Sequence, residues 1–584
     1  MGQQQRNSCL IAMREEGLAA SRCDGSAGRR SRLLTLCGAA LVAIVAAIGG
    51  PASQAQSQSL PGGSQGMVAA NHPLATFAGM DVLLDGGNAV DAAVATAATL
   101  GVVEPALSGL GGDGVMLIYW AEADEVHALS FAGKAPDAIS GGRFAEEGLL
   151  PARGPRSVVV PGAPAGWDAA LERFGSLPIE RILAPAIDLA ENGYPASAFA
   201  AEAQGWAAQQ FLDYDEVGAE AWWGGDFMPP QVGDMIRNPR LGNTYRELAE
   251  QGLNSFYSGE IATTIIGFLE GHGGFLTTED FEAYDVSWHE PLTTTYRDFE
   301  IFTARRHSSG GLATLQILSI LEGFDLGGLQ LNGVEYTHLV VEAVKLAAAD
   351  RAVWSGDPAF LADAIPYERL LSKEYAAERR ALIDLDRAAP DVQAGIEQPG
   401  TSHVSVVDRA GNMVSLTVSL GLGWGSGVVA GETGVVMNNG LAMFDLDPES
   451  PTHIDGGKRV TWNMAPVLVA QDGQPFIVLG TPGGTGIWQV TPQILTKVLD
   501  FGLDLRSAIE SPRFRWELSG LGLGLESRIG ADTREGLEEL GHDVYEYEAW
   551  SISVGAANGI VIDFDEGVME GAADPRREGY VIGW

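Results

Sequence analysis

One threonine in the interior of the chain stands where a hidden nucleophile would. Thr401 follows a polar, turn-prone run from Ala394 to Gly400 and begins an alternation of apolar and polar residues that ends at Asp408. If the Gly400–Thr401 bond is cut, the freed threonine carries a hydroxyl and its own α-amine, so one residue supplies nucleophile and base. The simpler interpretation is a threonine that opens a strand, which is common because threonine favours strands. Taken alone, this stretch favours the simpler interpretation.

Two glycines further along could complete such a site. Gly483 and Gly484 follow an expected strand over 476–479 and precede an expected helix over 487–501. Their backbone N–H groups would lie near a helix N-terminus, which suits an oxyanion hole for acyl transfer. A tight turn is the alternative for this glycine pair. His403 follows Thr401 by two residues, on the same face of a strand, and both a structural and a catalytic role stay open for it.

Other common catalytic patterns are missing from the sequence. There is no phosphate-binding Walker A loop. The glycine-rich stretch 109–114 precedes a strand instead of following one, which argues against dinucleotide binding. The nine histidines never form His-x-x-x-His, so the sequence predicts no metal site and no cofactor.

The first 55 residues have the features of an export signal. Arg29, Arg30 and Arg32 precede an apolar run over 33–48, and small residues follow at 51–55. The arginines weakly resemble a twin-arginine signal. An uncleaved anchor is the alternative, but the run is shorter than the roughly 20 residues that usually span a bilayer. We therefore expect a signal peptide over 1–55, a linker over 56–65, and a periplasmic or secreted mature protein without stable membrane insertion.

Removing the signal peptide changes the composition that remains. All three cysteines, at positions 9, 23 and 37, lie within it, so the mature protein would have neither disulfides nor thiolate chemistry. Of the 36 basic and 76 acidic residues, the first 55 positions hold six and three, which leaves a net charge of −43. Such a charge repels phosphate backbones and argues against nucleic acid as a partner.

The pattern of expected elements changes at Thr401. Before it the sequence is mainly helical, with helices expected over 166–192, 308–321 and 335–352, and strands over 115–120 and 294–303. After it the sequence predicts strands over 403–407, 413–420, 435–438, 467–470 and 476–479. The first two of these flank a strong hairpin turn over 408–412.

A whole-chain resemblance overturns the simpler interpretation of Thr401. Ten motifs occur in order along the chain: Gly86-Gly87-Asn88-Ala89-Val90-Asp91, Gly101-Val102-Val103-Glu104-Pro105, Gly109-Leu110-Gly111-Gly112, Val160-Pro161-Gly162, Leu183-Ala184-Pro185-Ala186, Ser308-Ser309-Gly310-Gly311, Ala349-Asp350-Arg351, Thr401-Ser402-His403, Pro482-Gly483-Gly484 and Asp574-Pro575-Arg576-Arg577. On these motifs, the sequence from Gly66 to its end resembles the γ-glutamyltranspeptidase (glutathione hydrolase) family of N-terminal-nucleophile hydrolases.

The resemblance implies a fold and a set of catalytic residues. The expected fold is a four-layer α/β/β/α sandwich, one large domain formed by two autoprocessed subunits that pair as a heterodimer: a large subunit over 66–400 and a small one over 401–584. Higher oligomers stay open. Thr401 would be the nucleophile, Gly483 and Gly484 would donate to the oxyanion, and Ser419 stands where the family has a supporting threonine hydroxyl.

The residues that clamp a γ-glutamyl group in the family are replaced in this chain. The arginine that holds the substrate α-carboxylate falls at Ala132, and a Ser-Ser pair that contacts the same carboxylate falls at Trp462 and Asn463. The family aspartate that holds the α-amino group falls at Met443, and the glutamine of the same motif falls at Gly440. The family asparagine two residues past the supporting hydroxyl falls at Gly421. Apolar side chains cannot replace ion pairs, so we expect a zwitterionic glutamyl group to bind poorly.

Three functions are therefore weighed. The first is a glutathione hydrolase or γ-glutamyltransferase, which the whole-chain resemblance supports. The second is an amidohydrolase for a different acyl group, smaller or more apolar than γ-glutamyl, which the pocket residues support. The third is a non-enzymatic relative, against which Thr401, Ser419, Gly483 and Gly484 weigh. The partners expected are a small amide substrate and water or an amine acceptor.

Overall fold

The expected nucleophile lies in the middle of a seven-stranded antiparallel sheet. The computed structural model describes residues 61–584 except 140, 146, 207–210, 212–215, 391–399, 519 and 564–565. The strands of this sheet run in the order β19 (Tyr580–Gly583), β2 (Gly66–Ala70), β10 (Thr401–Asp408), β11 (Met413–Ser419), β3 (Asp113–Trp120), β4 (Glu125–Phe131) and β7 (Ser287–His289). The predicted hairpin between β10 and β11 is confirmed.

A second seven-stranded antiparallel sheet faces the first. Its order is β1 (Gly62–Gly63), β18 (Val568–Ala573), β17 (Asn558–Asp563), β13 (Gln474–Gly480), β12 (Val467–Gln471), β9 (Phe299–Thr303) and β8 (Leu292–Tyr296). Both sheets take strands from both sides of Thr401, so the two parts of the chain are woven into one unit.

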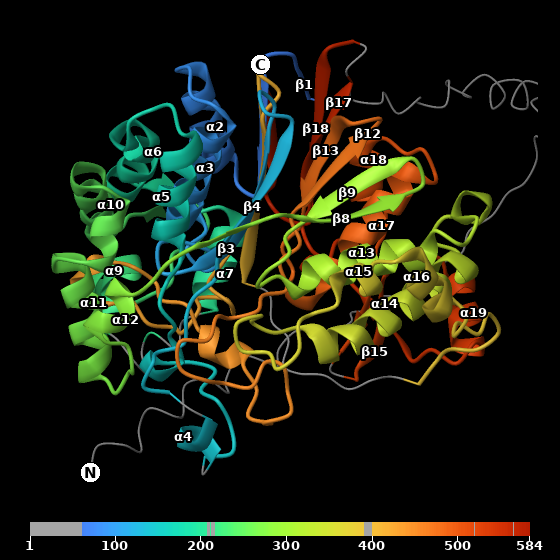
Figure 1. Cartoon of the computed structure of the whole chain (residues 1–584). Coiled ribbons are helices and arrows are strands. Elements are labelled where there is room, and N and C mark those ends of the chain that lie inside the picture. The colour runs from blue at the N-terminus through green and yellow to red at the C-terminus, as the bar shows by residue number, and fades with distance from the viewer. Residues whose placement is uncertain are drawn as a thin grey trace, which may run out of the picture. The chain divides into compact units, whose positions relative to one another are not determined.

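Helices cover the outer face of each sheet, as Figure 1 shows. Over the sheet with Thr401 lie α2 (Pro73–Leu84), α3 (Ala89–Val103), α5 (Ala163–Phe174), α6 (Ile179–Asn192) and α10 (Pro239–Gln251). Over the other lie α13 (Ser309–Leu321), α14 (Val334–Trp354), α17 (Ile487–Leu499) and α18 (Leu505–Glu510). The expected four-layer α/β/β/α sandwich is confirmed.

The strands are apolar on both faces because helices cover one face of each sheet and the other sheet covers the second face. In β3, Val115 and Leu117 pack into the core between the sheets, whereas Met116 and Ile118 pack under the helices. This alternation follows from the two-residue period of a strand, and it explains why these strands read as nearly continuous hydrophobic runs. The helix α3 is buried along its whole length and begins with a capping box between Asn88 and Asp91.

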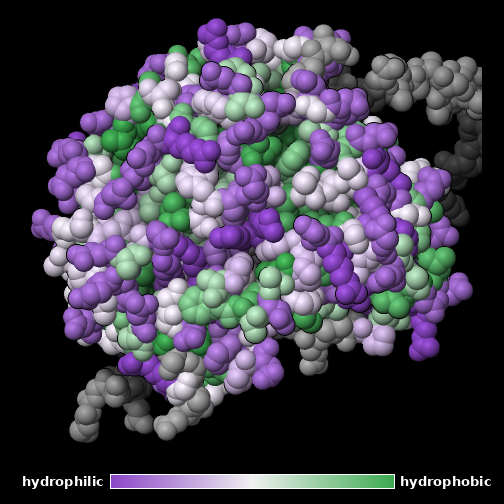
Figure 2. Space-filling model, viewed as in Figure 1, coloured by the Kyte–Doolittle hydropathy of each residue, from purple (hydrophilic) through white to green (hydrophobic). Residues whose placement is uncertain are grey.

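The remaining elements are short. They are α4 (Gly141–Ala145), α7 (Ala198–Gly205), α9 (Glu216–Trp223), α11 (Glu260–Gly271), α12 (Thr278–Glu282), α15 (Tyr367–Leu370), α16 (Lys373–Arg380), α19 (Ala531–Glu539), β5 (Tyr194–Pro195), β6 (Met235–Ile236), β14 (Phe514–Glu517), β15 (Gly522–Glu526) and β16 (Val544–Tyr547), together with eight 3₁₀ turns among the described residues. In Figure 2 hydrophobic residues form small patches scattered among hydrophilic ones.

Three expected elements differ from the structure. The single strand expected over 294–303 is a hairpin of β8 and β9, because Arg297 adopts a positive φ of 54° and turns the chain. The helix expected over 166–192 is divided into α5 and α6 at Gly175 and Pro178. Residues 435–438 form isolated bridges instead of a strand.

The expected export signal over 1–55 lies outside the described residues. The end of the expected linker is not free, since Gly62 and Gly63 pair with β18. In the described part of the chain, no helix combines the length and the apolar character that crossing a membrane requires.

Candidate active site around Thr401

Thr401 begins β10 and is almost completely enclosed. Only 5 % of its surface is exposed. It is paired with Ser419 of β11, and Ser419 is paired in turn with Asp113 of β3. Residues directly opposite each other in antiparallel strands point to the same face of a sheet. The two hydroxyls and the carboxyl therefore form one row across three neighbouring strands.

The hydroxyl of Ser419 connects Thr401 to the peptide bond before it. Ser419 Oγ lies 2.5 Å from the carbonyl oxygen of Gly400 and 3.2 Å from Thr401 Oγ1. It also accepts a hydrogen bond of 2.9 Å from the N–H of Gly421. Because a carbonyl oxygen can only accept, the single Ser419 proton goes to Gly400, and Thr401 Oγ1 must donate to Ser419 Oγ. Ser419 can thus polarise the Gly400 carbonyl while orienting the Thr401 hydroxyl.

Gly400 has room for no side chain. A Cβ built on it would lie 2.5 Å from the Gly421 carbonyl oxygen and from a backbone atom of Leu422. Gly421 itself has a φ of +98°, and a Cβ there would lie 2.1 Å from Asn439 Oδ1. Glycine at both positions lets the chain approach the row of hydroxyls closely.

Gly483 and Gly484 lie beside Thr401 in the turn between β13 and α17. Both have positive φ angles, 137° and 59°. Among the described residues neither of their N–H groups has a hydrogen-bond acceptor. Two unpaired donors ahead of a helix are what an oxyanion hole requires.

A pocket opens directly at Thr401 and Ser419. It contains about 440 Å³ of empty space, some of it open to solvent. Four of the six replaced clamp positions line it: Gly421, Met443, Trp462 and Asn463. None of its lining residues in the described chain carries a charge; the others are Leu422, Met464, Gly484, Thr485 and Ile487.

Ala132 and Gly440, also singled out from the sequence, do not line this pocket. Ala132 is fully buried, and its carbonyl oxygen accepts a 3.0 Å hydrogen bond from Arg459 Nη1. The Arg459 guanidinium is bound to Asp285 at 2.8 Å, so its charge is already paired. Gly440 faces Val159, whose Cγ2 would lie 2.4 Å from an added Cβ.

Asn439 takes over the space beside Gly421. Its Oδ1 accepts from the N–H of Leu422 at 2.9 Å, and its Nδ2 donates to the Ala152 carbonyl at 3.0 Å. The amide thus fixes the loop that carries Gly421 and Leu422, both of which line the pocket. The sequence pattern gave no sign of Asn439, because it acts through a contact between segments 17 residues apart.

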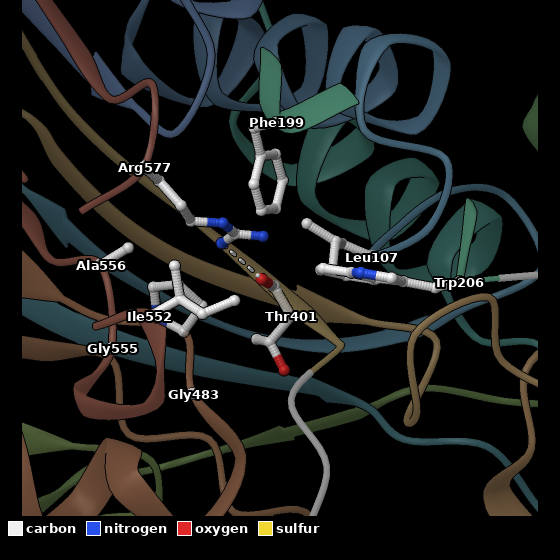
Figure 3. Close-up of a pocket in the computed structure, with 10 residues that line it drawn as sticks. Leu107, Phe199, Trp206, Thr401, Gly483, Ile552, Gly555, Ala556 and Arg577 are labelled. Atoms are coloured by element: carbon white, nitrogen blue, oxygen red, sulfur yellow. Dashed lines mark hydrogen bonds between the residues drawn. The ribbon is translucent and has the colours of Figure 1, made fainter. Parts of the chain in front are cut away.

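A second, smaller pocket also reaches Thr401, and Figure 3 shows the residues that line it. Phe199, Leu107 and Trp206 form an apolar wall, and the Arg577 guanidinium points toward Thr401. Arg577 Nη1 donates to the Thr401 carbonyl at 3.0 Å.

Arg577 belongs to a charged group that also touches the residue after Thr401. It lies 3.9 Å from Glu104, whose other carboxylate oxygen accepts from Ser402 Oγ at 2.7 Å. The ion pair between Arg577 and Glu104 thus holds the backbone carbonyl of Thr401 in place. The family motifs contain both Arg577 and Glu104, but only the structure places them together.

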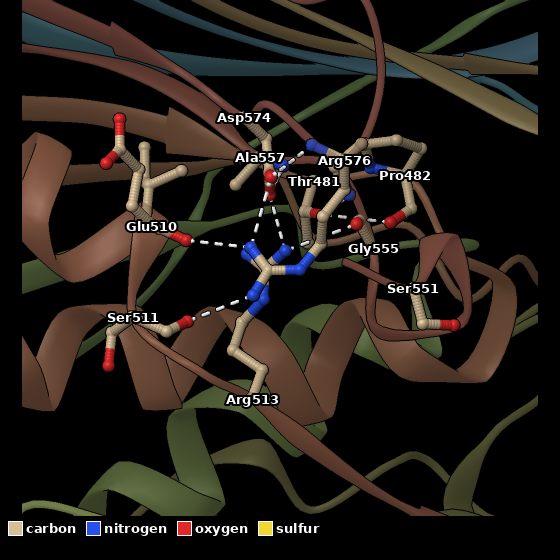
Figure 4. Close-up of polar contacts among 12 residues, drawn as sticks. Thr481, Pro482, Glu510, Ser511, Arg513, Ser551, Gly555, Ala557, Asp574 and Arg576 are labelled. Atoms are coloured by element: carbon tan, nitrogen blue, oxygen red, sulfur yellow. Dashed lines mark hydrogen bonds and ion pairs between the residues drawn. The ribbon is translucent and has the colours of Figure 1, made fainter. Parts of the chain in front are cut away.

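A buried ionic cluster supports the glycine turn (Figure 4). Arg513 pairs with Asp574 and donates to the Gly555 carbonyl at 3.2 Å. Asp574 also pairs with Arg576 at 3.1 Å, and all three side chains are fully buried. An added Cβ on Gly483 would lie 3.2 Å from Gly555, so the cluster holds the segment against which Gly483 packs.

His403 is too strongly bound to act as a base. Its ring nitrogens lie 2.9 Å from Thr417 Oγ1 and 3.2 Å from Ser405 Oγ. Burial lowers the pKa of His403 to about 3, so the ring is neutral at ordinary pH. Both nitrogens bind hydroxyls in the core between the sheets, which indicates a structural role.

Asp113 is the one carboxyl in the row of Thr401 and Ser419. Burial raises its pKa well above the usual range, against hydrogen bonds from the Gly162 and Gly133 N–H groups. The Gly162 N–H donates to Oδ1 at 3.0 Å. Burial thus makes the ionised form of Asp113 less favourable than it would be in water.

Comparison with known proteins agrees with this architecture. The family model for gamma-glutamyltranspeptidase matches residues 75–584. A glutathione hydrolase proenzyme of Bacillus subtilis is 32 % identical over 564 residues, which cover 91 % of this chain and 94 % of that protein. An acylase proenzyme, ACY 1, of Pseudomonas sp. strain V22 is 36 % identical over 532 residues, covering 88 % and 93 %.

A solved structure matches almost the whole described fold. The crystal structure of a cephalosporin acylase from Bacillus halodurans superposes with a TM-score of 0.83 at 32 % identity, covering 92 % of this chain and 99 % of that one. The family model and these relatives span both parts of the chain. The chain therefore belongs to the γ-glutamyltranspeptidase family and is an enzyme, an autoprocessed N-terminal-nucleophile hydrolase made as a proenzyme.

Proposed function

We propose that Thr401 performs two reactions, first on the chain itself and then on a substrate. In the first, Thr401 Oγ attacks the Gly400 carbonyl carbon, and the C–N bond to Thr401 breaks. The resulting ester is hydrolysed by water, which leaves a carboxylate on Gly400 and a free α-amine on Thr401. The bond from Ser419 Oγ to the Gly400 oxygen supports this step, because a donor there stabilises the charge that develops on that oxygen.

The second reaction uses the α-amine that the first releases. Thr401 Oγ attacks the amide carbonyl of the substrate and transfers its proton to the α-amine, while the N–H groups of Gly483 and Gly484 hold the oxyanion. The leaving amine takes the proton as the C–N bond breaks. Water, or less readily an amine, then attacks the acyl-enzyme and restores the Thr401 hydroxyl. Large and small chains, 66–400 and 401–584, stay paired because both sheets contain strands from each of them.

The acyl group is proposed to be uncharged, in contrast to a γ-glutamyl group. The observation that carries this proposal is the pocket at Thr401, where Met443 and Trp462 occupy the positions of charge-binding residues and no described lining residue is charged. A zwitterionic acyl group would lose its hydration there without gaining partners, at a cost of several kcal/mol. An apolar acyl group would instead gain roughly 25 cal/mol for each Å² that it buries.

Hydrolysis of γ-glutamyl amides, including glutathione, is the second candidate. The similarity to glutathione hydrolase proenzymes favours it. One structural observation does as well: the Arg351 guanidinium donates to Asn463 Oδ1 and to Ser309 Oγ, so a positive charge lies directly behind one residue of the pocket wall. A substrate carboxylate that reached Asn463 would be attracted by that charge.

The test is a set of anilides that share one leaving group and differ only in the acyl group. We expect the acetyl, butyryl and phenylacetyl compounds to include a substrate with kcat/KM at least tenfold above that of the γ-glutamyl compound. A higher kcat/KM for γ-glutamyl anilide, together with glutamate release from glutathione, would establish the second candidate instead. The Thr401→Ala variant is the matched control, since its residual rate reports contaminants.

Export to the periplasm or the medium is also proposed, on the basis of the charged and apolar pattern in residues 1–55. N-terminal sequencing of the large chain from the native host should then begin near Gln56. Recovery of the protein with residues 1–55 attached would contradict the proposal.

A further inference from the structure

Three buried side chains with metal-binding atoms meet on the helical layer remote from Thr401. They are His338 and Glu342, one turn apart on α14, and His542, which follows α19. One ligand atom from each lies within 4.8 Å of the other two, the only such group of three among the described residues. The exposed fractions are 1 %, 3 % and 7 % for His338, Glu342 and His542.

The surroundings of His338 fix which of its nitrogens can bind a ligand. His338 Nε2 lies 2.8 Å from the carbonyl oxygen of Asp384, which can only accept, so Nε2 carries the proton. The lone pair of Nδ1 is left facing His542 Nε2, at a distance of 2.8 Å. A histidine whose second N–H is held by a backbone carbonyl is the usual arrangement of a metal ligand, because the carbonyl orients the ring and raises its basicity.

Glu342 is held beside the two rings as a carboxylate. Both of its oxygens lie 3.2 Å from the N–H of Ala389, and Oε1 lies 3.2 Å from Lys345 Nζ. Lys345 also donates to the Ala389 carbonyl at 2.7 Å. The Lys345 ammonium group therefore competes with any cation for the Glu342 carboxylate. If the carboxylate turns toward a metal ion, Lys345 still has the Ala389 carbonyl as a hydrogen-bond partner.

We propose that His338 Nδ1, His542 Nε2 and the Glu342 carboxylate bind a divalent transition-metal ion, with Zn²⁺ as the best match. Imidazole nitrogen and carboxylate oxygen are ligands that zinc takes at about 2.0–2.2 Å. Two nitrogens on a tetrahedral zinc lie about 3.3 Å apart, so the present 2.8 Å separation has to widen by only about half an ångström. Water would complete the coordination.

The position of this site gives it a structural consequence. His338 and Glu342 come from the large chain, His542 comes from the small chain, and the segment from Asp384 to Ala389 that surrounds them ends just before the region of the cleavage point. A metal ion here would join the two chains and fix the C-terminal part of the large one. Metal binding itself does not depend on cleavage, so it can be tested in Thr401→Ala protein as well.

The experiment measures zinc bound to the purified full-length protein after dialysis, by elemental analysis and by calorimetric titration. We expect one Zn²⁺ per chain, a rise in melting temperature on adding zinc, and visible d–d bands when Co²⁺ is substituted. His542→Gln should weaken binding at least tenfold. His272→Gln, a change at the exposed residue that caps the C-terminus of α11, should not. Lys345→Met should tighten binding, since it removes the competing ammonium group.

The alternative is a neutral hydrogen bond between His338 and His542 that binds no metal. It predicts that zinc leaves the melting temperature of both wild-type and Lys345→Met protein unchanged, and that no zinc remains after dialysis. That result would overturn the proposal even if His542→Gln failed to fold, because Lys345→Met keeps all three ligands.

Discussion

Ser419 Oγ lies 3.2 Å from Thr401 Oγ1 and gives its proton to the Gly400 carbonyl oxygen. One hydroxyl thus serves both partners of the expected cleavage reaction, the attacking oxygen and the carbonyl it attacks. Antiparallel pairing of β10 with β11 places it there, since Thr401 and Ser419 are direct partners across the two strands.

Thr401→Ala should leave the chain uncleaved and inactive. The substitution removes the attacking oxygen in both proposed reactions, so we expect at least about a thousandfold loss of amide hydrolysis. Denaturing electrophoresis should show one band in place of two. Cleavage at the normal position in Thr401→Ala protein would contradict the assignment.

Ser419→Ala should slow maturation without abolishing it. Loss of a donor to a developing oxyanion costs about 10²–10³ in rate, so the half-time of cleavage should lengthen by roughly a hundredfold. Ser419→Thr keeps the hydroxyl and is the matched control, expected to recover most of the rate. Equal cleavage rates for the alanine and threonine variants would exclude a role for the hydroxyl.

Met443→Asp should reduce hydrolysis of apolar acyl anilides at least tenfold, because it places a carboxylate in the uncharged pocket. Met443→Leu conserves volume and polarity, and its kcat/KM should stay within about threefold of wild type. The comparison is made on protein shown to be cleaved. If Met443→Asp left kcat/KM unchanged, Met443 would not contact the acyl group.

Asp574→Asn should destabilise the fold and delay cleavage. Asp574 is fully buried between Arg513 and Arg576, and removing one partner of a buried ionic cluster typically costs about 3–5 kcal/mol. Thermal unfolding should show a clear drop in melting temperature. Asp472→Asn, at an exposed turn, is the control and should change the melting temperature little.

His403 should contribute to acid sensitivity. The folded ring stays neutral down to a pKa of about 3, while the ordinary histidine pKa is 6.5. Between these values the unfolded state binds the extra proton, so stability falls as the pH drops through this window and is retained above it.

His72 and His289 act in the same direction, with pKa values lowered by burial to about 4 and about 3. Replacing one of the three should therefore flatten the pH dependence only in part. For His403→Gln, the slope of unfolding free energy against pH should decrease by up to about 1.4 kcal/mol per pH unit between pH 4 and 6. An unchanged slope would show that His403 is protonated in the folded protein.

Several features of the site follow from local sequence. The alternation after Thr401 and the turn at 408–412 determine the hairpin of β10 and β11, and this hairpin alone places Ser419 beside Thr401. The Gly483–Gly484 pair between a strand and a helix likewise fixes where unpaired N–H groups lie. Short-range patterns suffice here because both partners belong to one hairpin or one turn.

Other features depended on the order in which distant segments pack. No sequence pattern placed Arg577 on the Thr401 carbonyl or Asn439 beside Gly421. The family resemblance placed Ala132 and Gly440 in a pocket that they do not line. Spacing along the chain also argued against any metal site, whereas His338 and His542 meet although 204 residues separate them. The sequence by itself thus determined the hairpin that carries the expected nucleophile. Only the tertiary structure decided the walls around it and the histidine cluster, because side-chain periodicity specifies which face an element buries but not which distant element covers that face.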